Sequence, residues 1–278
     1  MKWTPGSREN IEDRRGQRVG GRGGPIGIGV VLVLLVLSLL TGKNFLSFVD
    51  PGAVTGGGGG AATEGPLETT PDEERLVDFM GFVLEDNQKT WQQLLGGQYQ
   101  ATTLVLFRNA TTTACGYGQS ASGPFYCPGD GKVYLDLSFF DELDRRFGAP
   151  GDFAQAYVIA HEIGHHIQNI TGLERQVRQA QQQRPDQANQ LSVRMELQAD
   201  CYAGVWGHAA AQRGYLETTD VEEGLRAASS IGDDRIQRQS GGSVSPESFT
   251  HGSSEQRVSW FRRGLESGAA NACDTFSR

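Results

Sequence analysis

Residues 157–168 read YVIAHEIGHHIQ and decide the centre of the fold. Residues four apart on a helix lie on one face, one turn apart, so His161 and His165 are expected to face the same way. Two imidazoles on one face can bind one Zn²⁺ in a tetrahedral site. Glu162 lies about 100° around the helix from His161, where it can reach a metal-bound water without ligating the metal. The pattern predicts a zinc site with Glu162 as the general base.

The residues around this motif are apolar, which indicates a buried helix over residues 152–170. Buried helices seldom carry His and Glu without partners, which argues against a polar surface helix with coincidental histidines. Gly164 lowers helix stability, and we expect it to mark the close approach of another backbone or of the metal site. His166 points to another face, and we interpret it as a packed or supporting histidine rather than a ligand.

Two histidines and a water leave one protein ligand missing from a four-coordinate site. Residues 166–172 read HIQNITG and place no further histidine close behind the motif. Residues 194–206, RMELQADCYAGVW, put Glu196 and Asp200 one turn apart on a second apolar helix. We expect Glu196 to be the third ligand and Asp200 to accept a hydrogen bond from a ligand imidazole. Exchanged roles, or a solvated acidic face, are the alternatives.

The N-terminal part of the chain differs in composition from the rest. Residues 1–24 carry six basic and three acidic side chains, although the whole chain has a net charge of −8. Residues 26–40, IGIGVVLVLLVLSLL, contain no charge, so we interpret residues 25–42 as an uncleaved transmembrane signal anchor, with a cleaved signal peptide as the alternative. Residues 43–71 include GGGGG and predict a flexible linker before a folded domain at 72–278.

Charge and cysteine content predict the location and the partners. The positive-inside rule places residues 1–24, expected to be a disordered tail, in the cytoplasm and the folded domain outside, on a single-pass anchor. The acidic body argues against nucleic acid as a partner.

The chain has four cysteines, which an exported domain can oxidise. Cys115 and Cys127 flank the turn-rich GYGQSASGPFY and are the favoured pair. Cys201 with Cys273 follows by elimination, with a buried free thiol at Cys201 as the alternative.

Periodicity predicts an α+β fold that mixes helix and strand in its first half and has a mainly helical C-terminal half. Strands are expected over 102–107 and 133–137. Helices are expected over 72–95, 152–170, 173–183, 186–212, 219–238 and 253–266.

Five segments together carry a family resemblance: HEIGHH, RMELQADCYAGVW, CGYGQSASGPFYCPGDGKVYLDLSFFDEL, THGSSEQRVSWF and CDTF. The chain resembles the bacterial neutral zinc metallopeptidase family of YpfJ-like proteins over most of residues 72–278, and it shares their N-terminal anchor. The resemblance implies a zincin-like fold, in which a small mixed or antiparallel sheet lies over the active-site helix, and a peptide or protein substrate. It also implies one zinc per chain with His161, His165 and Glu196 as ligands and Glu162 as base.

The segments ELQAD and HGSSEQR also look like gluzincins of the CAAX-protease and HtpX type. That resemblance implies that His251 donates a hydrogen bond to the reaction's oxyanion and that Arg257 is an ion-pair partner. Gly252 stands where a proline is usual, so a simple loop role for His251 is the alternative. Zincins commonly bind a substrate peptide along an edge strand, and residues 133–137, VYLDL, are our candidate.

We therefore predict a membrane-anchored zinc metallopeptidase. One alternative is a catalytically inactive, zinc-stabilised envelope scaffold or interaction protein. Glu162 argues against it, because a structural zinc site needs no base and closes its fourth position. A zinc amidase acting on cell-wall peptides is a further alternative, since it uses similar chemistry.

Overall fold

The computed structural model describes residues 1–18, 63–64, 66–120, 123–239, 241 and 243–277. The chain divides into two compact units, Met1–Arg15 with Leu67–Arg278, and Gly16–Pro66. In the second unit, the described residues form an antiparallel pair of β2 (Gln17–Arg18) and β3 (Thr63–Glu64). The other described elements belong to the first unit.

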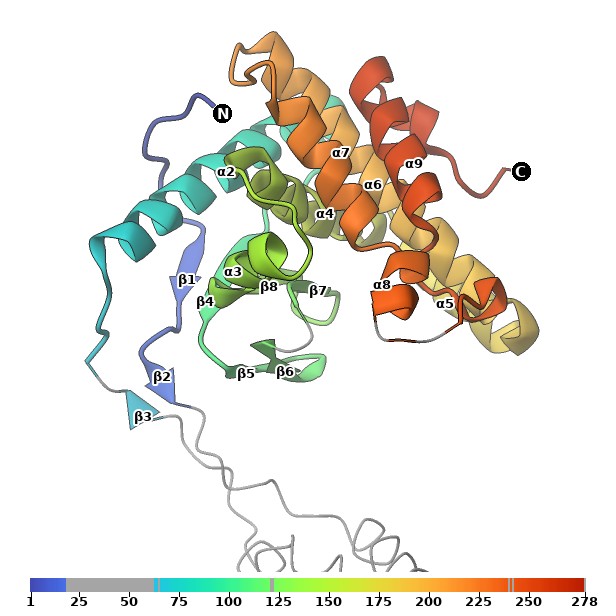
Figure 1. Ribbon diagram of the computed structural model, residues 1–278, viewed down its shortest axis with the longest axis horizontal. Coiled ribbons are helices and arrows are strands. Elements are labelled where there is room, and N and C mark those ends of the chain that lie inside the picture. The colour runs from blue at the N-terminus through green and yellow to red at the C-terminus, as the bar shows by residue number, and fades with distance from the viewer. Residues whose placement is uncertain (19–62, 65, 121–122, 240, 242, 278) are drawn as a thin grey trace, which may run out of the picture. The chain divides into compact units, whose positions relative to one another are not determined.

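The first unit contains a four-stranded sheet with the order β1-β4-β8-β7 (Figure 1). The strands β1 (Ile11–Asp13), β4 (Thr103–Phe107) and β8 (Lys132–Asp136) are parallel to one another. The short strand β7 (Phe125–Cys127) pairs antiparallel with β8 and forms one edge of the sheet. The expected strands at 102–107 and 133–137 are therefore β4 and β8, in the middle of the sheet.

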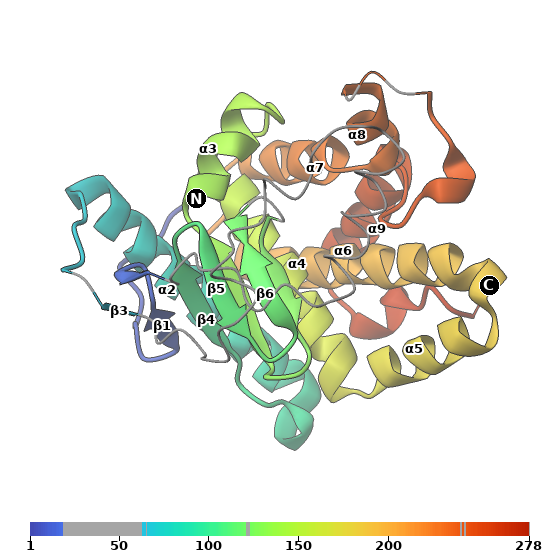
Figure 2. The same ribbon diagram turned by 90° about the horizontal axis from the view of Figure 1, so that it is seen from below.

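Alternating side chains of β4 and β8 enter two separate cores, as the pleat of a strand requires. Leu104 and Leu106 belong to the main core, which α2 and α4 complete. Val105 and Phe107 belong to a smaller core on the other face. The hairpin of β5 (Ala110–Thr113) and β6 (Gly116–Gln119) lies over this second face (Figure 2), where a Cβ on Gly118 would lie 2.6 Å from the Phe125 ring.

The remaining described elements are helical, and in Figure 1 α6, α7 and α9 run side by side. The α-helices are α2 (Pro71–Leu95), α3 (Ser138–Arg145), α4 (Asp152–Ile170), α5 (Leu173–Gln183), α6 (Ala188–Gln212), α7 (Asp220–Ser230), α8 (Asp233–Gln239) and α9 (Ser254–Ser267). Short 3₁₀ turns cover Gly96–Gln98, Pro185–Gln187, Pro246–Ser248 and Ala270–Cys273. The predicted α+β class with a helical C-terminal half is confirmed.

The expected helix over 219–238 is two helices, α7 and α8, which separate at Gly232. A Cβ on Gly232 would lie 2.3 Å from the backbone nitrogen of Ser254, so the start of α9 passes directly against this position. The break is a consequence of helix packing, which periodicity does not reveal.

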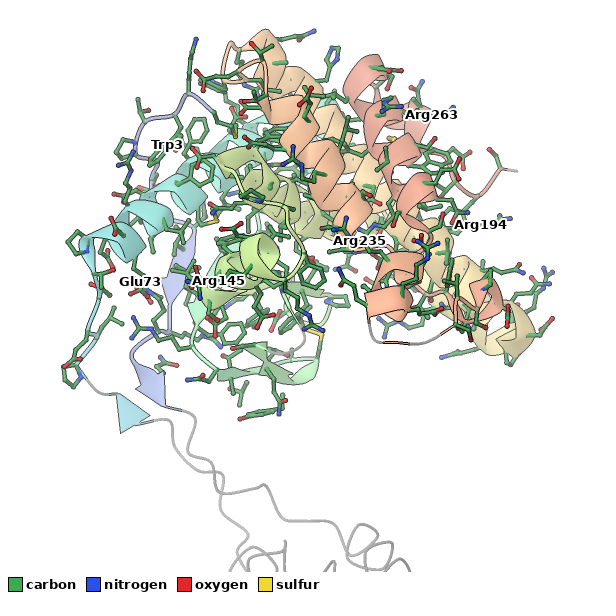
Figure 3. The ribbon with its side chains drawn as sticks, in the orientation of Figure 1. Trp3, Glu73, Arg145, Arg194, Arg235 and Arg263 are labelled. Atoms are coloured by element: carbon green, nitrogen blue, oxygen red, sulfur yellow. A yellow bond between two sulfur atoms is a disulfide. The ribbon has the colours of Figure 1, made fainter. Side chains whose placement is uncertain are left out.

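The prediction of a disordered tail is wrong for residues 1–15, because they are part of the first unit. The Trp3 ring lies 5.0 Å from that of Phe79 on α2 (Figure 3). A Cβ on Gly6 would lie 2.1 Å from the backbone nitrogen of Phe82, which shows how closely the segment follows α2. Arg8 Nη1 lies 2.7 Å from Glu74 Oε2. A basic residue that suggested a cytoplasmic tail therefore neutralises an acid near the start of α2.

The predicted anchor at 25–42 and residues 43–62 of the predicted linker lie outside the described residues. Within the part of the chain that the structure describes, no helix combines the length and apolar character needed to cross a bilayer. A single crossing would put Met1–Arg15 and Leu67–Arg278 on opposite sides of a membrane, whereas both belong to one compact unit. The expected arrangement, with residues 1–24 inside and the catalytic domain outside, is incompatible with this packing.

Candidate metal centre

The two helices that carry the site approach each other closely at Gly164. A Cβ at this position on α4 would lie 2.9 Å from the Cα atom of Ala199 on α6. Any larger residue would push the helices apart, so the stability that glycine costs the helix is offset by close packing. The expected backbone approach at Gly164 is present, and it aligns the motif of α4 with Glu196 and Asp200 of α6.

The three predicted ligands lie together. One ligand atom from each of His161, His165 and Glu196 lies within 4.8 Å of the others. The Nε2 atom of His161 is 3.2 Å from Glu196 Oε2, and that of His165 is 3.5 Å from Glu196 Oε1. Two imidazole nitrogens and a carboxylate oxygen around one point form a donor set that suits Zn²⁺.

His161 is oriented by a buried network around Asp200. Its Nδ1 atom donates to Asp200 Oδ1 at 2.9 Å, which turns Nε2 toward Glu196. Arg257 donates to both oxygens of the same carboxylate, from Nε at 2.8 Å and from Nη2 at 2.9 Å. The hydroxyl of Tyr157 also donates to Asp200. The sequence did not indicate Tyr157, although it lies one turn before His161 on the same helix face.

The network controls the charge of its members. Burial opposes ionisation of Asp200, but the Arg257 guanidinium outweighs it and holds the pKa of that carboxyl below its usual value. Burial also disfavours the charged imidazole of His161, but the Asp200 carboxylate overcomes this and raises the pKa of His161 to about 10. The pKa of Glu196 is lowered, because the two histidines outweigh its burial. The carboxylates of Asp200 and Glu196 are thus kept ionised.

His165 is supported by a neutral partner instead. Its Nδ1 atom lies 2.9 Å from Gln168 Oε1, and the Gln168 amide donates to the backbone oxygen of Met195 at 2.7 Å. Gln168 was not predicted as a site residue. The sequence could have indicated this contact, because Gln168 follows His165 by three residues and side chains at that spacing on a helix are neighbours.

Glu162 lines the same cleft as the cluster but is not part of the ligand set. Burial raises the pKa of Glu162, with the nearby histidines opposing that effect. A carboxylate with a raised pKa in the same cleft as the His/His/Glu cluster suits a general base.

His251 also reaches the cleft, held by Asp233. Its Nδ1 atom lies 3.0 Å from Asp233 Oδ1, and Asp233 Oδ2 accepts from the backbone nitrogens of Thr250, His251 and Gly252. Gly252 has a φ of +91°, which proline cannot adopt, so the departure from the gluzincin pattern follows from the local backbone. Asp233 is a further residue that the sequence reading missed, since it precedes His251 by 18 residues.

These residues share one cleft of about 880 Å³. Its walls come from β7, α3, α4, α5, α6 and α8, together with Ile231 after α7 and residues near the start of α9. The prediction that VYLDL is an edge strand is wrong, because this segment forms β8, which lies between β4 and β7. The strand at the edge is β7, and its residues Phe125 and Tyr126 line the cleft.

His166 points away from the cluster, in agreement with the prediction. Its Nε2 atom lies 2.6 Å from the backbone oxygen of Gln100, and its Nδ1 atom lies 3.1 Å from the Tyr126 hydroxyl. Burial lowers the pKa of His166. The residue thereby joins α4 to the β7 wall.

Both predicted disulfides are present. Cys115–Cys127 joins the turn of the β5–β6 hairpin to β7. Cys201–Cys273 joins the C-terminal segment to α6, at the residue after Asp200. The alternative of a free thiol at Cys201 is therefore excluded.

Comparison with known proteins shows the family to which the chain belongs. A model of the family described as "Putative neutral zinc metallopeptidase" matches residues 1–276. YpfJ of Escherichia coli K12, named an uncharacterized protein, is 49% identical over 290 residues, covering 100% of this chain and 99% of YpfJ. The uncharacterized protein Rv2575 of Mycobacterium tuberculosis is 46% identical over 198 residues, covering 67% of this chain and 66% of that protein. No solved structure gives a significant match.

The α+β fold, with its helix-borne His/His/Glu cluster, is zincin-like. The chain belongs to the putative neutral zinc metallopeptidase family. The family match begins at residue 1, which agrees with the packing of Met1–Arg15 into the first unit.

Proposed function

We propose that this protein is a zinc-dependent peptidase that hydrolyses peptide bonds in the cleft beside α4. The observation that carries the proposal is the convergence of His161, His165 and Glu196 within one cleft that also contains Glu162. A purely structural zinc site would close its fourth position and would need no base. The three-residue ligand set and the presence of Glu162 therefore both argue against a catalytically inactive scaffold.

The residues present fit one zinc ion per chain. The Nδ1 atoms of His161 and His165 are engaged by Asp200 and Gln168, so both Nε2 atoms remain directed at Glu196. Three protein ligands leave one coordination position for water or substrate, as in catalytic sites. When bound, the ion lowers the pKa of a water ligand and polarises a carbonyl.

The chain's own groups supply the remaining functions. Glu162 accepts a proton from the attacking water and passes it to the leaving amine. His251, oriented through Nδ1 by Asp233, presents Nε2 to the cleft and donates to the developing oxyanion. The outer edge of β7, an edge strand among the described residues, pairs with the substrate backbone in place of the strand first expected.

The test uses purified full-length protein. Elemental analysis should find one zinc per chain, and a correctly folded preparation that takes up no zinc would refute the proposal. The Glu162→Gln protein should keep its zinc and lose roughly 10²- to 10⁴-fold in cleavage rate, the usual range for loss of a general base. Undiminished cleavage by this variant would show that Glu162 is not the base. Cell-wall peptides belong in the same assay, because their exclusive cleavage would assign the amidase chemistry instead.

We also propose that the first unit works in an oxidising compartment outside the cytoplasm. Its two disulfides support this location, since stable disulfides are rare in the cytosol. Because Met1–Arg15 packs in the same unit, both ends of the chain are expected in that compartment. Labelling of single cysteines placed at Ser7 and Ser277 by a membrane-impermeant reagent in intact cells tests this. Protection of the Ser7 site alone would contradict it.

A further inference from the structure

The cleft has chemically different ends along α4. Val158, Glu162 and His165 line it at helical spacing, so α4 runs along its floor. Val158 lies one turn before Glu162, toward the N-terminal end of α4. Gln168 lies beyond His165, toward the C-terminal end. A peptide bond held at the metal cluster would therefore have its neighbouring residues in two different environments.

The N-terminal end of the cleft is an apolar recess, formed by Phe139, Phe147, Val158, Ile231 and Ile236. These residues come from α3 and the turn after it, from α4, from the end of α7 and from α8. The tertiary structure alone brings them together, since they span almost 100 positions of the chain.

Two hydrogen bonds hold the walls of the recess in place. Arg235 on α8, labelled in Figure 3, donates from Nη2 to the backbone oxygen of Phe147 at 3.0 Å. Arg257 donates from Nη1 to the backbone oxygen of Ile231 at 3.3 Å. Arg257 is the same residue that orients Asp200, so the recess is tied to the network around His161.

The rim of the recess carries two exposed side chains of opposite charge, Glu142 and Arg146. The Arg146 guanidinium lies 5.5 Å from the centre of the Phe147 ring. Opposite charges at the rim give the recess no net preference for a charged group. Its walls are apolar, and an unpaired charge placed there would lose its hydration without compensation.

The other end of the cleft is mixed. Its polar side chains are Gln168, Glu174, Arg178, Gln181 and Ser192, and Val177 and Met195 lie among them. Tyr126 and Pro128 of the β7 wall also line this end, where Asn169 of α4 contacts both. Glu174 and Arg178 form an ion pair, and Gln181 donates to Ser192 at 2.9 Å. This end therefore offers several hydrogen-bonding side chains between its apolar residues, whereas the walls of the recess are apolar.

We propose that the recess binds a bulky apolar side chain on one of the two residues that flank the scissile bond. The substrate class is then a peptide with Leu, Ile, Met or Phe at that position. The inference rests on the proposed function for the placement of the scissile bond. Its basis is the contrast between the recess beside Glu162 and the mixed end beyond His165.

A binding measurement tests the recess without requiring turnover. Leucine, glycine and aspartate hydroxamates are titrated calorimetrically into the zinc-loaded full-length protein, whose zinc content is measured separately. Leucine hydroxamate should bind at least about 10-fold more tightly than glycine hydroxamate, the usual discrimination of an apolar pocket. Aspartate hydroxamate should bind more weakly than the leucine compound. Equal affinity for leucine and glycine hydroxamates would overturn the inference.

Two matched variants locate the effect. Ile236→Glu places a carboxylate in the recess and should remove most of the preference for leucine hydroxamate. Gln181→Glu adds the same charge at the mixed end and should leave the preference unchanged. An equal loss in both variants would also overturn the inference. A wild-type protein that shows the preference but cleaves no peptide would refute the proposed function and leave the recess assignment intact.

Discussion

The α6–α9 wall of the cleft and the β7 wall are built differently. On the helical wall, Asp200 and Arg257 form a buried ion pair that orients His161, and the buried disulfide Cys201–Cys273 adjoins it. On the β7 wall, a three-residue edge strand is held by hydrogen bonds from α4 and by a disulfide whose Cys115 is exposed. Under the proposed function, metal ligands need a fixed geometry, whereas an edge strand that binds substrate must stay accessible. The two walls would then separate metal holding from substrate binding, and each wall can be perturbed by itself.

The largest effect is expected from Asp200. Replacement by Ala leaves the Arg257 guanidinium buried without its partner, which costs about 3–5 kcal/mol of unfolding free energy. Asp200→Asn keeps the shape and should weaken zinc binding about 10- to 100-fold, as loss of a ligand-orienting carboxylate does. Urea unfolding and competitive zinc titration measure the two effects. Gln168→Leu is the control, because Gln168 contacts His165 as Asp200 contacts His161. We expect it to weaken zinc binding less than Asp200→Asn, and a larger loss would contradict this expectation.

The next effect is expected from the disulfide of the helical wall. Its cysteines are 72 residues apart, and opening such a loop costs about 4 kcal/mol by chain entropy. We expect the Cys201→Ser/Cys273→Ser protein to unfold at lower urea and to bind zinc less tightly, because Cys201 follows Asp200. Unchanged zinc affinity in a folded variant would show that the disulfide does not support the network.

A smaller loss of stability is expected from the disulfide of the β7 wall. Its cysteines are 12 residues apart, which corresponds to about 3 kcal/mol. The Cys115→Ser/Cys127→Ser protein should keep its zinc content and lose substrate affinity, seen as a raised KM, because the edge strand is less restrained. A fall in zinc content equal to that of the other pair would show that the walls are not independent.

The smallest effect concerns His251. Its hydrogen bond to Asp233 raises the pKa of His251 above its ordinary value. Glu196 adds to this effect, while burial and Arg257 oppose it. The contact between His251 and Asp233 therefore stabilises the folded state fully below the pKa that His251 has in the unfolded chain. This stabilisation is lost as the pH rises through the pKa of His251 in the folded protein. Asp233→Asn should lower the pKa of His251 and flatten stability over this pH range.

NMR titration of the His251 ring, combined with urea unfolding at several pH values, checks this change. The Asp234→Asn protein is the control, since Asp234 accepts hydrogen bonds from the backbone nitrogen and the hydroxyl of Ser254 at the start of α9. A pKa of His251 that stays the same without Asp233 would contradict the assigned cause.

Local sequence patterns were sufficient for much of the helical half. Both α4 and α5 have the expected bounds. The apolar residues of α4 mark a buried helix, and α5 is a polar, Gln-rich helix that breaks before Pro185. Patterns were insufficient where an element is short or where another segment interrupts it. The three residues of β7 carry no alternation, and the break at Gly232 depends on α9.

The N-terminus shows a different kind of failure. Basic residues before an apolar run indicate a cytoplasmic tail, but the same residues also suit an acidic helix surface. Here Arg8 pairs with Glu74 and Asp78 of α2, and β1 pairs with β4. These partners are some 60 to 100 positions away in the chain, so no local pattern could choose between the two interpretations.

By itself the sequence determined which functional side chains lie on the same helix face. Helical periodicity requires His161 and His165 to share a face, and the same periodicity pairs Glu196 with Asp200. Only the tertiary structure decided which partner each group has. It brings Asp200 to His161, Gln168 to His165 and Asp233 to His251, and it makes β7 the edge strand beside the cleft. Periodicity follows from backbone geometry within one helix, whereas these contacts depend on how separate elements pack.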